Sequence, residues 1–450
     1  MFVERIESPG LAHLSWLVGD GGEAAVIDPR RDCAVYLERA AARKCRIIRI
    51  FETHRNEDLV SGASALAARS RAPVHHGPRA DGTVTYATTV REGDVFRLGR
   101  VRLVVLETPG HTDDSLSFAL YHDGDAAIGV FTGDALFYGD VGRTDFYPHR
   151  AAEVAGLLYD SLQKLLALGN QAVVWPAHGA GSICGGRIAD RETSTLGLER
   201  RSNPMLRIDD RDAFIRTKLA EHHYQPPYFR LMERLNLTGV AAPPEPVVPP
   251  ALTAAAFEAA GATVVDVRGV AAFLGAHVPD SLCLPVGMVP AFAGWLLDPD
   301  EPLVLVADDG GQAATATRHL ARIGYDRVAG FLAPAITGWA ESGRPFRRLP
   351  AIDTTEVARR LAGRGNDWTL LDVRGLPEVE AAPMPGATHI YVGELAARLA
   401  TLDPARPTTT MCASGARAAI AASLLLRAGF RTVDVYLGSM GAWQASRGRD

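Results

Sequence analysis

Residues 45–62 read CRIIRIFETHRNEDLVSG, an apolar run of strand character that ends in a cluster of polar side chains. The same pattern returns in EAAVIDP, VRLVVLETPGH, AAIGVFTGD and QAVVWPAH, with Gly-rich turns between the runs. Each run ends in a residue able to bind a metal or to organise a site. Because rigid strands deliver side chains to loops at a sheet edge, this pattern predicts an α/β enzyme domain.

Four signatures follow one another in this part of the chain: THRNEDLVSG (Thr53–Gly62), TPGHTDDS (Thr108–Ser115), FTGDALF (Phe131–Phe137) and PAHG (Pro176–Gly179). Together they resemble the metallo-β-lactamase superfamily. The resemblance implies an αββα sandwich for residues 1–238.

The opening motif of that superfamily is H-x-H-x-D-H, and this chain departs from it. His54 and Asp58 are kept, but Asn56 and Leu59 stand where the other two histidines are expected. A two-metal hydrolase needs both metal positions filled to activate a bridging water. Leu59 has no donor atom and Asn56 is a poor zinc ligand, so a binuclear zinc hydrolase is disfavoured.

Three candidate ligands remain: His54, His111 and Asp134. Two imidazoles and one carboxylate can form a face that leaves metal positions open and suits non-haem Fe(II). Spacing alone does not exclude zinc or manganese. In persulfide dioxygenases, which the run GRTDF (Gly142–Phe146) also resembles, the iron ligands occupy the matching positions. The resemblance therefore implies one Fe(II) per chain.

Other polar residues near these motifs are given supporting roles. Asp58 and His178 serve a second metal in binuclear relatives, and here they are expected to orient ligands or water. Arg143 either binds the carboxylate of a thiol cofactor or pairs with Asp140 or Asp145.

A proline-rich stretch, GVAAPPEPVVPPA (239–251), predicts a stiff linker over residues 239–250. Beyond it the sequence repeats, because ATVVDVRGVAAF from Ala262 matches WTLLDVRGLPEV from Trp368. Strands alternate with amphipathic helices in both copies, which predicts two α/β domains with parallel sheets, 251–350 and 351–450.

The second copy places Cys412 between an apolar strand and a helix, in the loop Cys412-Ala413-Ser414-Gly415-Ala416-Arg417. Backbone N–H groups, the helix N-terminus and Arg417 are expected to stabilise a thiolate and to hold sulfite or thiosulfate. Gly415 suits close backbone approach. The loop resembles that of sulfur-transferring rhodaneses, which implies that Cys412 carries a persulfide.

The first copy has no such nucleophile. Alignment sets Ala307 opposite Cys412 and Gln312 opposite Arg417, while Asp308 and Asp309 would repel anions. This copy is predicted to be an inactive rhodanese-like module.

The composition excludes several other classes of function. A net charge of -5 without a basic block argues against nucleic acid and anionic membranes as partners. Five cysteines and no signal-peptide pattern indicate reduced thiols and a cytoplasmic location. Cys184, close to His178 in sequence, is either a thiol near the pocket or a small buried residue.

In domain order the chain resembles bacterial persulfide dioxygenase–rhodanese fusions. The resemblance implies oxidation of a small-thiol persulfide by O₂ to sulfite, followed by formation of thiosulfate at Cys412, as detoxification of sulfide. The thiol, glutathione, coenzyme A or another, is not identified, and a homodimer or homotetramer is expected. Two alternatives stay open: a mononuclear zinc thioester hydrolase of glyoxalase II type with an appended sulfurtransferase, and a non-enzymatic persulfide carrier or sensor.

Overall fold

The computed structural model describes residues 1–78, 84–243, 248–363 and 367–447. They form two compact units: unit 1 holds Met1–Pro243 with Arg322–Gly324, and unit 2 holds Pro244–Ala321 with Tyr325–Asp450. The predicted linker lies partly outside the described residues, and the proposed domain limits stay predictions. No helix within the described ranges is long and apolar enough to span a bilayer.

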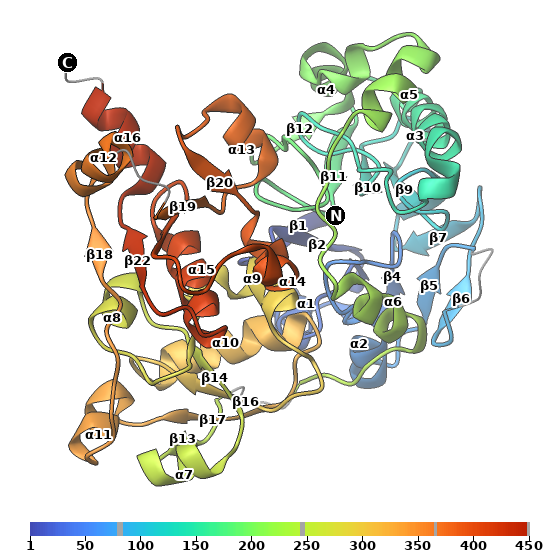
Figure 1. Ribbon diagram of the computed structural model, residues 1–450. Coiled ribbons are helices and arrows are strands. Elements are labelled where there is room, and N and C mark those ends of the chain that lie inside the picture. Colours follow the sequence, from blue (N-terminus) through green and yellow to red (C-terminus); the bar gives the residue numbers. More distant parts are fainter. Residues whose placement is uncertain (79–83, 244–247, 364–366, 448–450) are drawn as a thin grey trace. The chain divides into compact units, whose positions relative to one another are not determined.

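Unit 1 contains, in its described residues, two six-stranded sheets (Figure 1). The first has the order β1-β2-β3-β4-β5-β6 and the second the order β12-β11-β10-β9-β8-β7. Their strands are β1 (Phe2–Ser8), β2 (His13–Asp20), β3 (Glu23–Ile27), β4 (Arg46–Phe51), β5 (Val74–His76), β6 (Ala87–Thr89), β7 (Val95–Leu98), β8 (Val101–Glu107), β9 (Leu116–His122), β10 (Gly129–Gly133), β11 (Val173–Pro176) and β12 (Ser194–Thr195).

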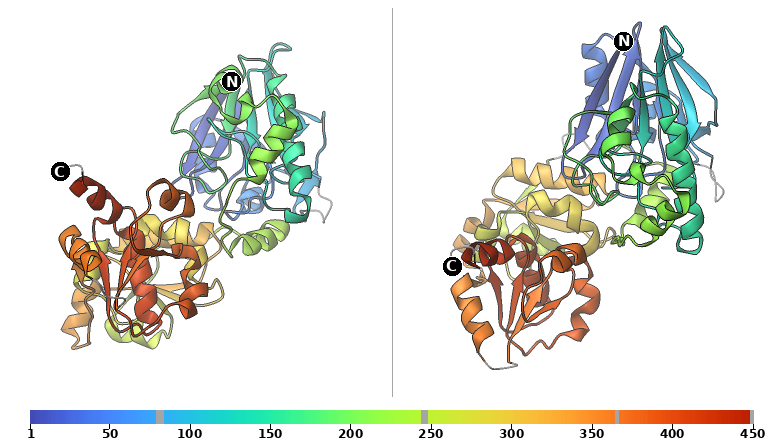
Figure 2. Two further views of the ribbon diagram at one scale, coloured as in Figure 1. Left: turned by 45° about the horizontal axis from the view of Figure 1, so that its top comes forward. Right: turned by 90° about the horizontal axis from the view of Figure 1, so that it is seen from above.

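The two sheets lie face to face, as the right view of Figure 2 shows, and apolar side chains from both sheets pack between them. Trp16 and Phe51 from the first sheet pack in one core with Phe118 and Phe131 from the second. Helices cover the outer faces: α1 (Ala34–Ala42) and α2 (Ala63–Ser70) on the first sheet, and α3 (Ala151–Leu166), α4 (Leu196–Ser202) and α5 (Arg211–Leu219) on the second. A further helix, α6 (Phe229–Thr238), ends the unit. The predicted αββα sandwich is confirmed.

Unit 2 contains two parallel five-stranded sheets among its described residues. The first has the order β13-β17-β16-β14-β15 and the second the order β18-β22-β21-β19-β20. Their strands are β13 (Ala251–Leu252), β14 (Thr263–Asp266), β15 (Leu282–Cys283), β16 (Leu303–Val306), β17 (Val328–Leu332), β18 (Ala351–Ile352), β19 (Thr369–Asp372), β20 (Ala387–His389), β21 (Thr408–Met411) and β22 (Val433–Tyr436). The two sheets share one topology, so the sequence repeat is a structural repeat.

Helices surround both sheets of unit 2. They are α7 (Ala254–Ala259), α8 (Val270–Gly275), α9 (Val289–Leu296), α10 (Gly310–Arg322), α11 (Ala335–Glu341), α12 (Thr354–Ala362), α13 (Leu376–Ala381), α14 (Leu395–Arg398), α15 (Ala416–Arg427) and α16 (Ser439–Arg447). Cys283, at the end of β15, donates its backbone N–H to the Ser423 hydroxyl on α15 (3.0 Å), which joins the two repeats. All five cysteines are free.

Candidate metal centre and sulfur-transfer loop

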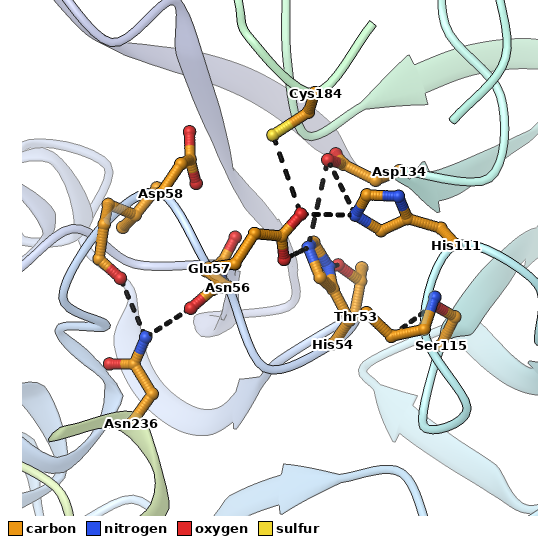
Figure 3. Close-up of polar contacts among 12 residues, drawn as sticks. Thr53, His54, Asn56, Glu57, Asp58, His111, Ser115, Asp134, Cys184 and Asn236 are labelled. Atoms are coloured by element: carbon orange, nitrogen blue, oxygen red, sulfur yellow. Dashed lines mark hydrogen bonds and ion pairs between the residues drawn. The ribbon is translucent and has the colours of Figure 1, made fainter. Parts of the chain in front are cut away.

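The three predicted ligands come from separate strand ends of unit 1 and meet in one buried cluster (Figure 3). His54 follows β4, His111 lies between β8 and β9, and Asp134 follows β10 directly. Asp134 Oδ2 lies 3.4 Å from His111 Nε2 and 3.9 Å from His54 Nε2. The strand ends therefore converge as the sequence pattern predicts.

Hydrogen bonds at the far side of each imidazole set its orientation. His111 Nδ1 donates to the carbonyl of Arg143 (2.9 Å). The Thr53 hydroxyl donates to Asp28 (2.8 Å) and lies 2.9 Å from His54 Nδ1, from which it can accept. A proton on Nδ1 leaves the Nε2 lone pair of each ring facing the cluster.

The inward atoms of the cluster fit a bound divalent metal. His54 Nε2, His111 Nε2 and Asp134 Oδ2 are buried and have no hydrogen-bond partner among the described residues. Buried polar atoms are nearly always satisfied, so converging orphan atoms need an explanation. Two imidazole nitrogens and a carboxylate oxygen are donors that iron, zinc and manganese all accept.

A second group, Asp58, His178 and Cys184, lies beside the first. His178 contacts Asp134 through Nδ1 (2.8 Å) and Asp58 through Nε2 (2.9 Å). His178 thus holds a predicted ligand in place, as an orienting residue should. Cys184 is buried, and that burial raises the pKa of its thiol.

Two residues that the sequence analysis missed shape this site. Glu57 joins His54, His111 and Asp134 in the buried cluster. Asn236, on α6, donates to the carbonyls of Asn56 (2.7 Å) and Leu59 (2.8 Å) and so fixes the loop that carries Glu57. The position of Glu57 within the motif was a signal for it, whereas nothing local marks Asn236.

Arg143 forms an ion pair with Asp145, one of the two aspartates considered as its partners. Its guanidinium donates to both carboxylate oxygens of Asp145 (2.6 Å each) and to the carbonyls of Ile183 and Tyr224. The side chain is buried. These contacts brace the loops around the metal cluster.

In unit 2, Cys412 follows β21 directly and lies before α15. Its Sγ accepts the backbone N–H of Gly415 (3.1 Å), and the Ser439 hydroxyl lies 4.0 Å away. Gly415 has φ 106°, a left-handed conformation that only glycine adopts at low cost. The loop therefore turns the Gly415 N–H toward the sulfur, one of the backbone donors that the sequence leads us to expect there.

Arg417 is engaged by an acidic residue that the sequence analysis did not single out. Its Nη1 and Nη2 donate to the two carboxylate oxygens of Glu378, on α13, at 2.6 and 2.7 Å. Burial opposes ionisation of Glu378, but Arg417 outweighs it and the pKa of the carboxyl is lowered. The positive charge expected beside Cys412 is thus partly neutralised.

The equivalent loop of the first repeat is closed by its own side chains. Ala307 follows β16 as Cys412 follows β21. Asp309 accepts the backbone N–H of Gln312 (2.8 Å), and Gln312 accepts that of Asp308 (2.8 Å). This loop offers no thiol, and two of its backbone amides, those of Asp308 and Gln312, already donate to side chains of the loop itself.

Comparisons with known proteins agree with this division of the chain. The metallo-beta-lactamase superfamily model matches residues 8–178, and the rhodanese-like domain model matches residues 250–342 and 353–446. A hydroxyacylglutathione hydrolase of Brucella anthropi is 35% identical over 197 residues, covering 38% of this chain and 70% of that protein. Eight curated relatives are matched over between 45% and 81% of their own length.

Two solved structures are also similar. A metallo-beta-lactamase from Staphylococcus aureus subsp. aureus COL aligns with TM-score 0.67 and 29% identity, covering 74% of this chain and 98% of that chain. ETHE1 from Myxococcus xanthus aligns with TM-score 0.46 and 30% identity, covering 53% of this chain and 98% of that chain.

Proposed function

Because this chain belongs to the metallo-β-lactamase superfamily and carries two rhodanese-like domains, we propose that it is a persulfide dioxygenase coupled to a sulfurtransferase. A small-thiol persulfide, O₂ and water would give the free thiol, sulfite and two protons. A second persulfide would then pass its outer sulfur to Cys412, and sulfite would remove that sulfur as thiosulfate. The first repeat would take no part in the chemistry.

The observation that carries the proposal is the donor set of unit 1. His54, His111 and Asp134 present orphan atoms to one point, while Leu59 offers no donor where a second metal would need one. Bound Fe(II) would supply one-electron chemistry with O₂ at its open positions. His178 orients Asp134 and Thr53 orients His54 through hydrogen bonds. Because the cluster is buried, bulk water has limited access to it.

In unit 2, the residues around Cys412 favour attack on a sulfane sulfur. The Gly415 N–H donates to the sulfur, and such a donor stabilises the thiolate that is the nucleophile. Arg417 could bind an oxyanion of sulfite or thiosulfate if it were released from Glu378.

The test is O₂ consumption by the anaerobically Fe(II)-loaded full chain on addition of glutathione persulfide or coenzyme A persulfide, with sulfite and thiosulfate measured together. We expect rapid O₂ uptake and thiosulfate as the product. Absence of O₂ uptake with every small persulfide, despite bound metal, would remove the dioxygenase. Persulfidation of Cys412 without O₂ consumption would then favour a carrier.

A zinc-dependent thioester hydrolase is the second candidate, and the curated hydroxyacylglutathione hydrolase relatives favour it. It predicts hydrolysis of S-lactoylglutathione by the zinc-loaded protein without any O₂ requirement. The missing second-metal donor at Leu59 argues against it.

A further inference from the structure

Glu57 lies between the two imidazoles of the metal cluster, as Figure 3 shows. Its Oε1 is 2.8 Å from His111 Nε2, and its Oε2 is 3.8 Å from His54 Nε2. The residue is 7% exposed, and Oε2 has no hydrogen-bond partner among the described residues. A buried carboxylate is thus directed at the point where the three predicted ligands meet.

A hydrogen bond from a neutral His111 ring does not explain this placement. His111 Nδ1 donates to the Arg143 carbonyl, so in a neutral ring Nε2 carries a lone pair and cannot donate to Glu57. A lone pair and a buried carboxylate 2.8 Å apart repel each other unless a positive charge neutralises them.

From this geometry we infer that Glu57 is a fourth protein ligand of the metal that His54, His111 and Asp134 hold. The inference rests on the proposed metal-dependent function. One donor atom from each of the four residues lies within 4.8 Å of all the others. Donors that share one ion at about 2.0–2.2 Å lie no more than about 4.4 Å apart, so only small side-chain shifts are needed for a single ion to contact all four. Cys184 Sγ lies 3.8 Å from Glu57 Oε1, where its thiol can donate and steady the carboxylate.

A fourth ligand would change which metal the site favours. Four protein donors close a tetrahedral zinc site, which then resembles a structural one, because catalytic zinc keeps a position for water. A metal that prefers six donors would still have two positions free, enough for a sulfur ligand and O₂. Glu57 is therefore a specificity-determining residue that favours iron chemistry over zinc hydrolysis.

The test measures metal binding by the full chain, independently of turnover. Wild type, Glu57→Ala and the near-isosteric Glu57→Gln are stripped with chelator and titrated anaerobically with Fe(II) and with Co(II), against a competing chelator. We expect Glu57→Ala to weaken binding at least about tenfold, because even residues that only orient ligands cost 10–100-fold. The visible Co(II) spectrum should also change, since a donor has been lost.

Glu52→Gln is the matched control. Glu52 is likewise a buried glutamate beside a histidine, 3.2 Å from His76 Nδ1, but it lies outside the metal cluster. Its variant should keep the wild-type Co(II) spectrum and affinity. If both Glu57 variants also keep them, the inference is wrong. Wild-type O₂ uptake is measured separately, so loss of the dioxygenase proposal and loss of the Glu57 ligand are distinguishable.

Discussion

Replacing Glu378 by glutamine should strengthen thiosulfate binding at the Cys412 loop about fivefold. In the resting protein the Arg417 guanidinium is bound by both oxygens of Glu378, at 2.6 and 2.7 Å. An anionic substrate must break this pair before Arg417 can bind it. The Glu378 side chain is 41% exposed, so water screens the ion pair. Because the arginine binds both carboxylate oxygens, the strength of the pair lies near the upper end of the range for exposed ion pairs, about 1 kcal/mol. Release of that energy corresponds to about a fivefold lower KM.

The glutamine variant is a clean perturbation because its amide oxygen can still accept the Gly375 N–H, which Glu378 accepts at 3.0 Å and which caps α13. Glu356→Gln is the control, since Glu356 also binds an arginine, Arg359, through two oxygens in the same domain but on α12. The assay is sulfur transfer from thiosulfate to cyanide by the full chain at low ionic strength. An unchanged or higher KM for thiosulfate in Glu378→Gln, with Glu356→Gln normal, would refute the reasoning.

Three further outcomes are expected. Cys412→Ser should abolish sulfur transfer and change the product of persulfide oxidation from thiosulfate to sulfite, measured by ion chromatography; continued thiosulfate formation would place the nucleophile elsewhere. Asp134→Ala should retain less than about a tenth of the wild-type iron by elemental analysis, and full retention would exclude it as a ligand. Burial alone would lower the pKa of His76, but Asp114 and Glu52 raise it to about 9 from 6.5. The folded state binds this proton more tightly than the unfolded state does, which contributes about 3 kcal/mol to the free energy of unfolding. This contribution is present in full below the pKa of His76 in the unfolded chain, and it is lost as the pH rises through the pKa of His76 in the folded protein. In urea unfolding, the difference in free energy of unfolding between wild type and His76→Gln should therefore shrink as the pH rises from 6.5 to about 9. A difference that stays constant with pH would contradict the raised pKa of His76.

The backbone of both candidate sites could be predicted because its determinants are local. Each apolar run ends where a polar residue follows, so the strand ends of His54, His111 and Asp134 are readable from short segments. The repeat in unit 2 is readable for the same reason, and the Cys412 loop follows from its strand, glycine and helix. The end of a strand fixes where the backbone of the next residue lies, and a few neighbouring residues in the sequence suffice to predict that end.

The side-chain partners could not be predicted in this way, because packing between distant segments decides them. Arg417 pairs with Glu378, which lies on another helix. Asn236 donates to the loop at Asn56, which is 180 residues away in the sequence. From the sequence, Arg143 could pair equally with Asp140, with Asp145 or with the carboxylate of a thiol cofactor, and only the structure shows that its partner is Asp145. Glu57 lies within the first motif, which is a weak signal because carboxylates are common in loops, and only the structure shows its side chain among the imidazoles.

Glu378 also affects the selectivity of the Cys412 loop. It binds Arg417 through both carboxylate oxygens, so it competes with the anionic sulfur compound proposed to bind there. A free Arg417 would attract any small anion from solution, whereas the paired Arg417 must first be released from Glu378. Breaking this pair offsets part of the electrostatic gain from binding. The loop would therefore trade affinity for selectivity, and removal of the Glu378 carboxylate should admit simple anions such as phosphate or chloride as inhibitors.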